Sequence, residues 1–206
     1  MQLILIRHAL PVRQESATDA VDPGLAPLGR RQAEAVAQWL AGESVDAIVS
    51  SPMRRAQETA APLARATGLP VMIDPALEEY DGGRRSYVPL HEVTDPDHPR
   101  RRRVRAGLLP EFVDVSGFRK RVVDGLGRVI DAHPGRATVV CFCHGGVINA
   151  YVSTVLGIER PLPFPIDYVS TTRILVSRTG RRVVRSINED GHVRALPRPG
   201  AVVVGG

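Results

Sequence analysis

The sequence predicts an α/β fold, a three-layer α/β/α sandwich built around a mostly parallel sheet. Short apolar runs alternate along the chain with longer segments in which apolar residues recur every three to four positions. Such alternation is typical of a sheet that is covered by helices on both faces. Two of the apolar runs end in a histidine, and the carboxyl ends of parallel strands are where these folds bind ligands.

The first apolar run, residues 3–6, is followed directly by Arg7 and His8. A short continuous run of this kind fits a strand that is buried on both faces. We therefore expect a strand that directs two side chains, an arginine and a histidine, at one site. The alternative is a strand that simply ends on two solvated polar residues.

The next segments continue the alternation. Residues 28–41 carry apolar side chains on one helical face, and residues 45–49 form a second strand-like run. A helix should follow, because Pro52 is suited to an early helical position, and Pro62 should interrupt and kink it. The apolar positions of the first helix are Ala33, Val36, Ala37 and Leu40.

Arg54 and Arg55 fall in the first turns of this second helix, where the helix dipole opposes cations. Two interpretations stay open: a solvated pair, or a guanidinium held ready for a bound anion. A guanidinium fork matches the geometry of phosphate better than an ammonium group does.

The second half of the chain repeats the pattern. Residues 71–73 are strand-like, and apolar spacing from Phe118 predicts a helix that ends at residues 133–135. Residues 170–177 and 183–187 look like late strands. The alternation thus extends over nearly the whole chain.

A second histidine lies at the end of the apolar run 138–143, as His144, and Gly145 and Gly146 open an apolar-periodic helix after it. The unpaired N–H groups of a helix start favour an anion beside this histidine. Cys141, Cys143 and His144 also suggest zinc ligands, but the chain has no other cysteine to complete the set. We expect buried free thiols and no metal.

Five ordered segments resemble the motifs of the histidine phosphatase superfamily, also called phosphoglycerate mutase-like. The resemblance runs from residue 1 to about residue 157 and implies the phosphoglycerate mutase-like sandwich. The five segments are Arg7-His8-Ala9, residues 25–33, residues 51–60, residues 78–83 and His144-Gly145-Gly146.

The resemblance implies that His8 is the nucleophile and becomes phosphohistidine. Arg7, Arg55 and His144, with Gly145, would surround the phosphoryl group, and Glu79 would donate and accept protons. The chemistry agrees, since guanidinium and imidazole groups can stabilise a phosphoryl transition state without a metal or other cofactor. Glu78 and Asp81 are the competing candidates for the proton carrier.

The chain departs from the family pattern after the first histidine. Ala9 stands where the family has glycine, which is tolerated if its φ is negative. Residues 10–14 lack the Glu, Ser/Thr and Asn that mutases usually carry, which weakens the case for a glycolytic mutase. Gln14 either supplies the missing amide to the phosphate or is an ordinary loop residue.

Residues 84–116 form the part that family members vary, in the region that covers the active site. We expect substrate selection here, with Arg84, Arg85, Tyr87 and His91 as candidate contacts. The arginine-rich run 100–105 is expected to be a solvated helix face or a flexible loop.

Length and composition fit one domain over residues 1–206, with the segment at about 84–116 as its variable insert. No apolar stretch approaches the roughly 20 residues of a membrane span, so we expect a cytoplasmic protein with no membrane partner. The resemblance leaves a homodimer open.

The pattern favours a metal-independent phosphomonoester phosphatase of the histidine acid phosphatase type, which needs no cofactor and acts on a small phosphorylated metabolite. A cofactor-dependent phosphoglycerate mutase is the enzyme alternative. The net charge of +5 also suggests a nucleic-acid-binding or regulatory protein on the same fold. The scarcity of aromatic residues and the complete catalytic set argue against nucleic acid as the partner.

Overall fold

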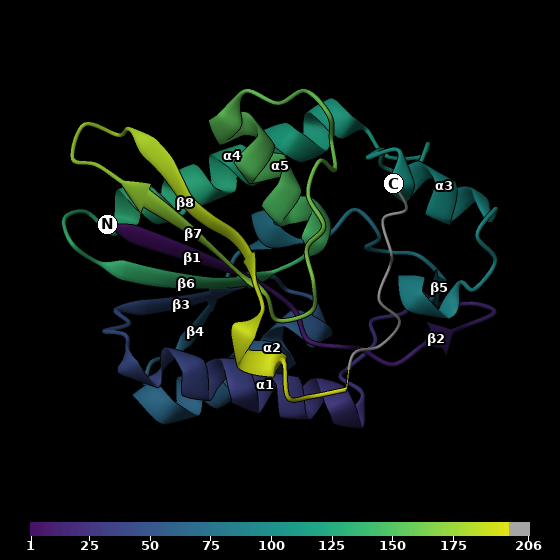
Figure 1. Cartoon of the computed structure of the whole chain (residues 1–206), viewed down its shortest axis with the longest axis horizontal. Helices are drawn as coiled ribbons and strands as arrows, with labels where there is room; N and C mark the ends of the chain where they lie inside the picture. The colour runs from purple at the N-terminus through teal and green to yellow at the C-terminus, as the bar shows by residue number, and fades with distance from the viewer. Residues whose placement is uncertain (198–206) are drawn as a thin grey trace.

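Six strands form the central sheet, in the order β4-β3-β6-β1-β7-β8 (Figure 1). The computed structural model describes residues 1–197. β1 pairs in parallel with β6, β6 with β3, and β3 with β4, whereas β7 runs antiparallel to both β1 and β8. The predicted mostly parallel sheet is therefore confirmed. The strands are β1 (Gln2–Arg7), β3 (Ala47–Ser50), β4 (Val71–Ile73), β6 (Thr138–Cys143), β7 (Thr171–Val176) and β8 (Arg182–Glu189).

Four long helices cover the two faces of the sheet, with α1 and α2 below it and α4 and α5 above it in Figure 1. The alternating side chains of β1 separate the two cores. Leu3 and Leu5 pack with the residues of α4 and α5, and Ile4 and Ile6 pack with those of α1 and α2. The helices are α1 (Pro27–Trp39), α2 (Arg54–Thr67), α4 (Val115–Ala132) and α5 (Gly145–Leu156), with a short α3 (Pro99–Arg105).

The register of β1 against β6 places the two histidines at the same edge. Arg7 is aligned with Cys143, so His8 and His144 both follow the carboxyl ends of adjacent parallel strands. The His8 backbone N–H donates to the Cys143 carbonyl at 2.8 Å. The expected shared position of the two histidines therefore follows from strand pairing.

The prediction for the second helix was wrong in two details. α2 begins at Arg54, with Met53 as its N-cap, so Pro52 precedes the helix. Pro62 lies inside α2 without ending it. A proline removes one intrahelical hydrogen bond, but the buried residues Ala60 and Leu63 hold the neighbouring turns against the sheet.

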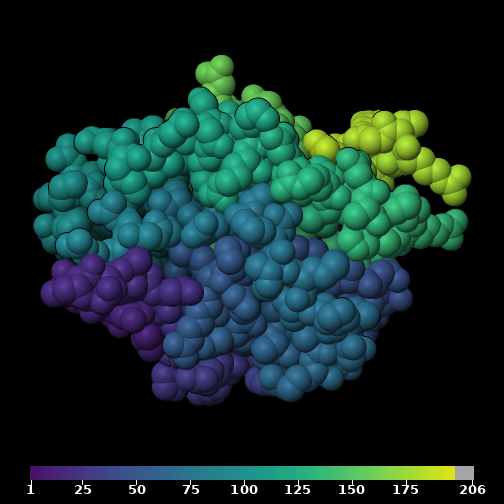
Figure 2. Space-filling view, turned by 180° about the vertical axis from the view of Figure 1, so that it is seen from behind, coloured from purple at the N-terminus to yellow at the C-terminus, as the bar shows by residue number. Residues whose placement is uncertain are grey.

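Two segments that are distant in sequence meet beyond the carboxyl ends of β1 and β3. β2 (Gln14–Glu15) pairs antiparallel with β5 (Ser86–Tyr87), and the loop after β2 adds a bond from the Val21 N–H to the Arg84 carbonyl. The 3-10 turn η3 (Leu90–Glu92) and α3 follow β5. Figure 2 shows residues of both segments, in purple and teal, side by side at one end of the molecule. We call residues 84–116 the cover segment.

Within residues 1–197, none of the helices combines the length and the apolar character that a membrane crossing requires.

Candidate active site

His8 is buried and has one ring nitrogen already engaged. Its Nδ1 lies 2.8 Å from the Ala9 carbonyl oxygen. Because a carbonyl oxygen only accepts, Nδ1 must carry the proton, and Nε2 keeps its lone pair. Burial, together with the charges of Arg55 and Arg7, holds the pKa of His8 well below its ordinary value. The ring is therefore neutral at pH 7 and has a nucleophilic nitrogen.

The backbone after His8 is fixed by a chain of hydrogen bonds to α2. The Ala9 N–H donates to Thr59 Oγ1 at 2.9 Å, and the Thr59 hydroxyl donates to the Arg55 carbonyl at 2.6 Å. Ala9 is not among the described residues with a positive φ, so its methyl group is tolerated as expected.

Two arginines reach the surroundings of His8 from different elements. Arg7 donates from Nη1 to the Ile166 carbonyl at 2.6 Å, and its guanidinium lies 4.0 Å from the centre of the Tyr168 ring. Arg55 is 1% exposed, and its Nη2 donates to Asp81 Oδ1 at 2.7 Å. Burial by itself would lower the pKa of Arg55, but Asp81 outweighs it and raises this pKa, so the guanidinium stays charged.

His144 lies beside His8, with 5.1 Å between the ring centres. Its Nε2 is 2.8 Å from Ser51 Oγ, while its Nδ1 is buried and has no hydrogen-bond partner within residues 1–197. Arg55 Nε is also buried and likewise has no hydrogen-bond partner within residues 1–197. Buried polar groups are normally hydrogen-bonded, and a bound anion would satisfy both of these. Burial and the neighbouring Arg55 lower the pKa of His144, so it is a neutral hydrogen-bonding group.

Glu79 is the buried carboxyl group of the site, 9% exposed. Its Oε2 accepts from the Gly146 N–H at 2.8 Å, and its Oε1 from the Tyr80 N–H at 3.2 Å. Burial raises the pKa of Glu79 to about 7, and the charge of Asp81 adds to the rise. With its pKa raised towards neutrality, this carboxyl group can carry or release a proton near pH 7, as a group that both donates and accepts protons should.

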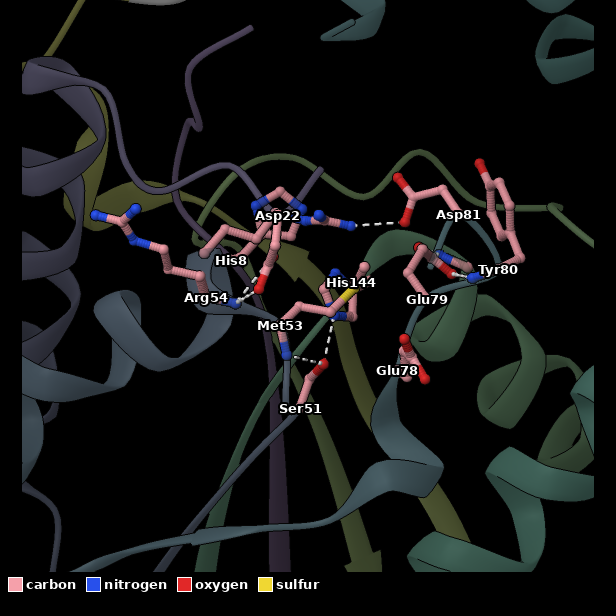
Figure 3. A network of polar contacts seen from close by, with 12 residues as sticks. His8, Asp22, Ser51, Met53, Arg54, Glu78, Glu79, Tyr80, Asp81 and His144 are labelled. Atoms are coloured by element: carbon pink, nitrogen blue, oxygen red, sulfur yellow. Dashed lines mark hydrogen bonds and ion pairs between the residues drawn. The ribbon is translucent and has the colours of Figure 1, made fainter. Parts of the chain in front are cut away.

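The segment that carries Glu79 is held from the α4 and α5 side. Arg121 of α4 donates to the carbonyls of Ala76 and Glu78, at 2.9 and 2.8 Å. Gly146 must be glycine for Glu79 to approach, because a Cβ there would lie 2.3 Å from Glu79 Oε1. Figure 3 shows Glu79, Asp81, His8 and His144 gathered in one region, with Glu78 below them in this view.

The five principal predicted residues, Arg7, His8, Arg55, Glu79 and His144, thus come together in the structure. The other predicted contacts divide into two groups. Tyr87 is buried against Arg55, with 4.7 Å between its ring centre and the guanidinium carbon, and the His91 ring lies 6.2 Å from that of Tyr168. Arg84, Arg85 and Gln14 are exposed: Arg84 lies over Phe112, Arg85 donates to Ala17, and Gln14 pairs in β2 with Tyr87.

Sequence reasoning missed Tyr168, whose ring centre is 5.7 Å from that of His8. It precedes Val169, a β-branched residue with φ of 53°, a strained conformation that is held by hydrogen bonds from the flanking backbone to Arg7. The Val169 N–H donates to the Arg7 carbonyl, and the Arg7 N–H donates to the Ser170 carbonyl. Nothing in the local sequence pattern marks this turn.

Cys141 and Cys143 are buried free cysteines, as expected, and burial raises the pKa of both thiols. Both pack in the core beneath α4 and α5. Residues 1–197 contain no group of three or more His, Cys, Asp or Glu side chains arranged to hold a metal ion.

Residues 3–189 match the family described as the histidine phosphatase superfamily (branch 1). The chain belongs to this superfamily. A probable phosphoglycerate mutase of Yersinia enterocolitica is 28% identical over 164 residues, 77% of this chain and 76% of the relative. A bifunctional protein of Mycobacterium tuberculosis is 30% identical over 203 residues, and the aligned region spans 93% of this chain but only 55% of that protein.

Solved structures of two phosphatases share the fold. A mycobacterial glucosyl-3-phosphoglycerate phosphatase, solved with vanadate, superposes with a TM-score of 0.74 at 25% identity, covering 92% of this chain and 99% of that one. A phosphoserine phosphatase variant of Entamoeba histolytica, at 24% identity and a TM-score of 0.69 over 93% of this chain and 98% of that one, shows the same fold. The superfamily and its phosphatase neighbours support a phosphatase-type hydrolase.

Proposed function

We propose that the chain is a metal-independent phosphomonoester phosphatase that works through a phosphohistidine on His8 and acts on a small phosphorylated metabolite. The observation that carries this proposal is the state of His8: it is neutral, its Nδ1 proton is engaged by the Ala9 carbonyl, and two guanidiniums lie close by. Such a ring attacks phosphorus from Nε2 while the arginines stabilise the phosphoryl oxygens.

In the first half of the proposed reaction, Arg7 and Arg55 bind the phosphoryl oxygens, and the unpartnered His144 Nδ1 and the start of α5 add hydrogen-bonding groups. His8 Nε2 forms a bond to phosphorus as the bond from phosphorus to the leaving oxygen breaks. Protonated Glu79 gives its proton to that oxygen, so the product leaves as an alcohol.

In the second half, the ionised Glu79 takes a proton from a water molecule as this water attacks phosphorus. The bond from phosphorus to nitrogen breaks, and inorganic phosphate, neutral His8 and protonated Glu79 are regenerated. One carboxyl group with a pKa of about 7 is suited to both halves, because both of its protonation states are populated near neutral pH.

The principal test is His8→Ala, with His133→Ala as its matched control. His133 lies at the end of α4, where its Nδ1 is bonded to the Val129 carbonyl, remote from His8 in the fold. In a screen of sugar phosphates, phosphoglycerates, nucleotides and phosphopeptides, we expect His8→Ala to release no phosphate and to form no acid-labile, base-stable phosphoenzyme. His133→Ala should turn over normally. Normal turnover by His8→Ala would contradict the proposal.

A phosphoglycerate mutase is the second candidate, supported by the name of the Yersinia relative. It is disfavoured by the segment after Ala9, in which Gln14 is exposed and paired in a β-ribbon. The phosphoenzyme distinguishes the two: hydrolysis within seconds in the presence of 3-phosphoglycerate supports a phosphatase, and efficient transfer between the 2- and 3-positions supports a mutase.

The basic run of the cover segment does not favour nucleic acid as a partner. Four of the five arginines in residues 100–105 have donors engaged by backbone carbonyls of their own segment, which leaves fewer donors for phosphate groups. The pairs are Arg100 with Val88, Arg101 with Val93, Arg103 with Leu109, and Arg105 with Pro96.

A further inference from the structure

Asp81 forms an ion pair with the buried arginine of the site, Arg55. Its Oδ1 accepts from Arg55 Nη2 at 2.7 Å, and its side chain is 19% exposed, against 1% for Arg55. The sequence pattern presents Asp81 only as a rival of Glu79 for the proton carrier. Its position supports a different role.

We propose that Asp81 is a positioning residue: it holds the Arg55 guanidinium in place for the phosphoryl group, and its negative charge favours the protonated, proton-donating form of the neighbouring Glu79. This inference rests on the proposed phosphatase function and assigns Asp81 a role within the same site.

The first part follows from the contacts of Arg55. One face of its guanidinium lies against the Tyr87 ring, and Nη2 is tied to Asp81, while Nε has no partner within residues 1–197. A long side chain has several rotamers, and a second anchor selects one of them. With Nη2 engaged, the unpartnered Nε is a donor available to a phosphoryl oxygen.

The second part follows from the groups that face Glu79. The Gly146 N–H of α5, the Tyr80 N–H and Arg55 of α2 favour its ionised form, while the Cys143 thiol of β6 and the Tyr80 phenol are neutral near pH 7. Asp81 opposes the ionisation. Like charges repel, so the carboxylate that is paired with Arg55 makes ionisation of the buried Glu79 less favourable.

The test is Asp81→Asn, which preserves the shape and an oxygen acceptor for Arg55 but removes the charge. The midpoint of the Glu79 carboxyl titration, measured by carbon-13 NMR on the resting protein, should fall by about one pH unit. The alkaline limb of kcat/KM should move by a similar amount. Asp81→Glu keeps the negative charge, so its Glu79 midpoint should stay close to that of the wild type. Glu78→Gln should leave both the midpoint and the alkaline limb unchanged.

Turnover on two kinds of substrate distinguishes the role of Asp81 in holding Arg55, which both substrates need, from its role in keeping a proton on Glu79, which only alkyl phosphates need. Asp81→Asn should lose roughly tenfold or more in kcat on alkyl phosphates, which need the proton, and less on p-nitrophenyl phosphate, whose leaving group does not. An unchanged Glu79 midpoint in Asp81→Asn would overturn the inference. Because the titration needs no substrate, a shifted midpoint in a protein without phosphatase activity would contradict the proposed function and leave the Asp81–Glu79 coupling supported.

Discussion

The carbonyl of the next residue, Ala9, accepts the Nδ1 proton of His8 and so leaves Nε2 free. The two arginines, in contrast, are positioned by contacts with residues that are distant in sequence. Arg7 is fixed by Ile166 and Tyr168, and Arg55 by Asp81. A single local hydrogen bond thus sets the tautomer, whereas the charge around the histidine is placed by distant parts of the chain.

Arg55 and the adjacent Arg54 provide a matched pair of substitutions. Arg55→Lys keeps a charge but loses the planar fork, so we expect turnover to fall roughly a hundredfold or more. Arg54→Lys should change it little, because Arg54 is exposed and paired with Glu58 at 2.6 Å. Steady-state kinetics on one substrate measures both. A larger loss in Arg54→Lys would mean that Arg54, and not Arg55, acts in the site.

At the scale of elements, α3 fastens the cover segment. Its arginines donate to carbonyls on both sides of η3, next to Tyr87 and His91, and so connect the arginine run to the residues that pack against Arg55 and Tyr168. Hydrogen bonds from a charged donor contribute about 1.5–3 kcal/mol each. The run forms a helix, one of the two predicted alternatives, and four of its five arginines donate hydrogen bonds within the cover segment.

Arg100→Ala removes the bond to Val88 and should loosen β5 and η3. We expect amide hydrogen exchange over residues 86–93 to accelerate by about tenfold, the equivalent of ~1.4 kcal/mol of local stability. KM should rise, because Tyr87 and His91 lose their support. Arg102→Ala, on the same helix, is the control, because no hydrogen bond ties the Arg102 side chain to residues 86–93 in the described part of the chain. Equal exchange in the two variants would show that the bond to Val88 does not hold the segment.

For the whole molecule, the buried site opposes the stability that the two cores provide. Burial lowers the pKa of His8 and His144 below their ordinary value, so the unfolded state binds protons more tightly than the folded state. The free energy of unfolding is therefore highest with respect to these two groups above about pH 6.5, and it decreases as the pH falls below that value. Glu79 has the opposite sign. Its pKa is raised, so the folded state binds the proton more tightly than the unfolded one, and stability falls as the pH rises towards 7.

Glu79→Gln should therefore become more stable relative to the wild type as the pH rises. With an unfolded pKa of about 4.3 and a folded pKa of about 7, the difference in unfolding free energy should grow by about 3 kcal/mol between about pH 4.5 and pH 8. Urea denaturation at a series of pH values measures it.

Glu58→Gln is the control of opposite sign. Burial favours a higher pKa for Glu58, but bonds from the Leu25 N–H and Arg54 outweigh it and lower this pKa. Its substitution should cost more stability as the pH rises. A flat difference for Glu79→Gln would contradict the raised pKa of Glu79.

The layered fold and the meeting of the two histidines were predictable, because both depend on local patterns. Apolar runs mark buried strands, and residues that follow parallel strands share an edge, so the sequence places His8 and His144 at the same edge of the sheet; the pairing of β1 with β6 makes them neighbours. The interruption at Pro62 was wrong because packing on both sides of the proline outweighs one missing hydrogen bond.

Contacts between residues far apart in sequence decided how the side chains of the site are held. Arg7 meets Tyr168, Ser51 meets His144, Arg55 meets Asp81, and the α3 arginines turn inward to their own segment. No periodicity records such pairs, because they depend on how loops close over the sheet rather than on which residues are apolar. The sequence alone therefore determined the layers, the edge at which the site lies and the types of side chain there. The tertiary structure decided which carboxyl group is buried against the start of α5 and which arginine is anchored.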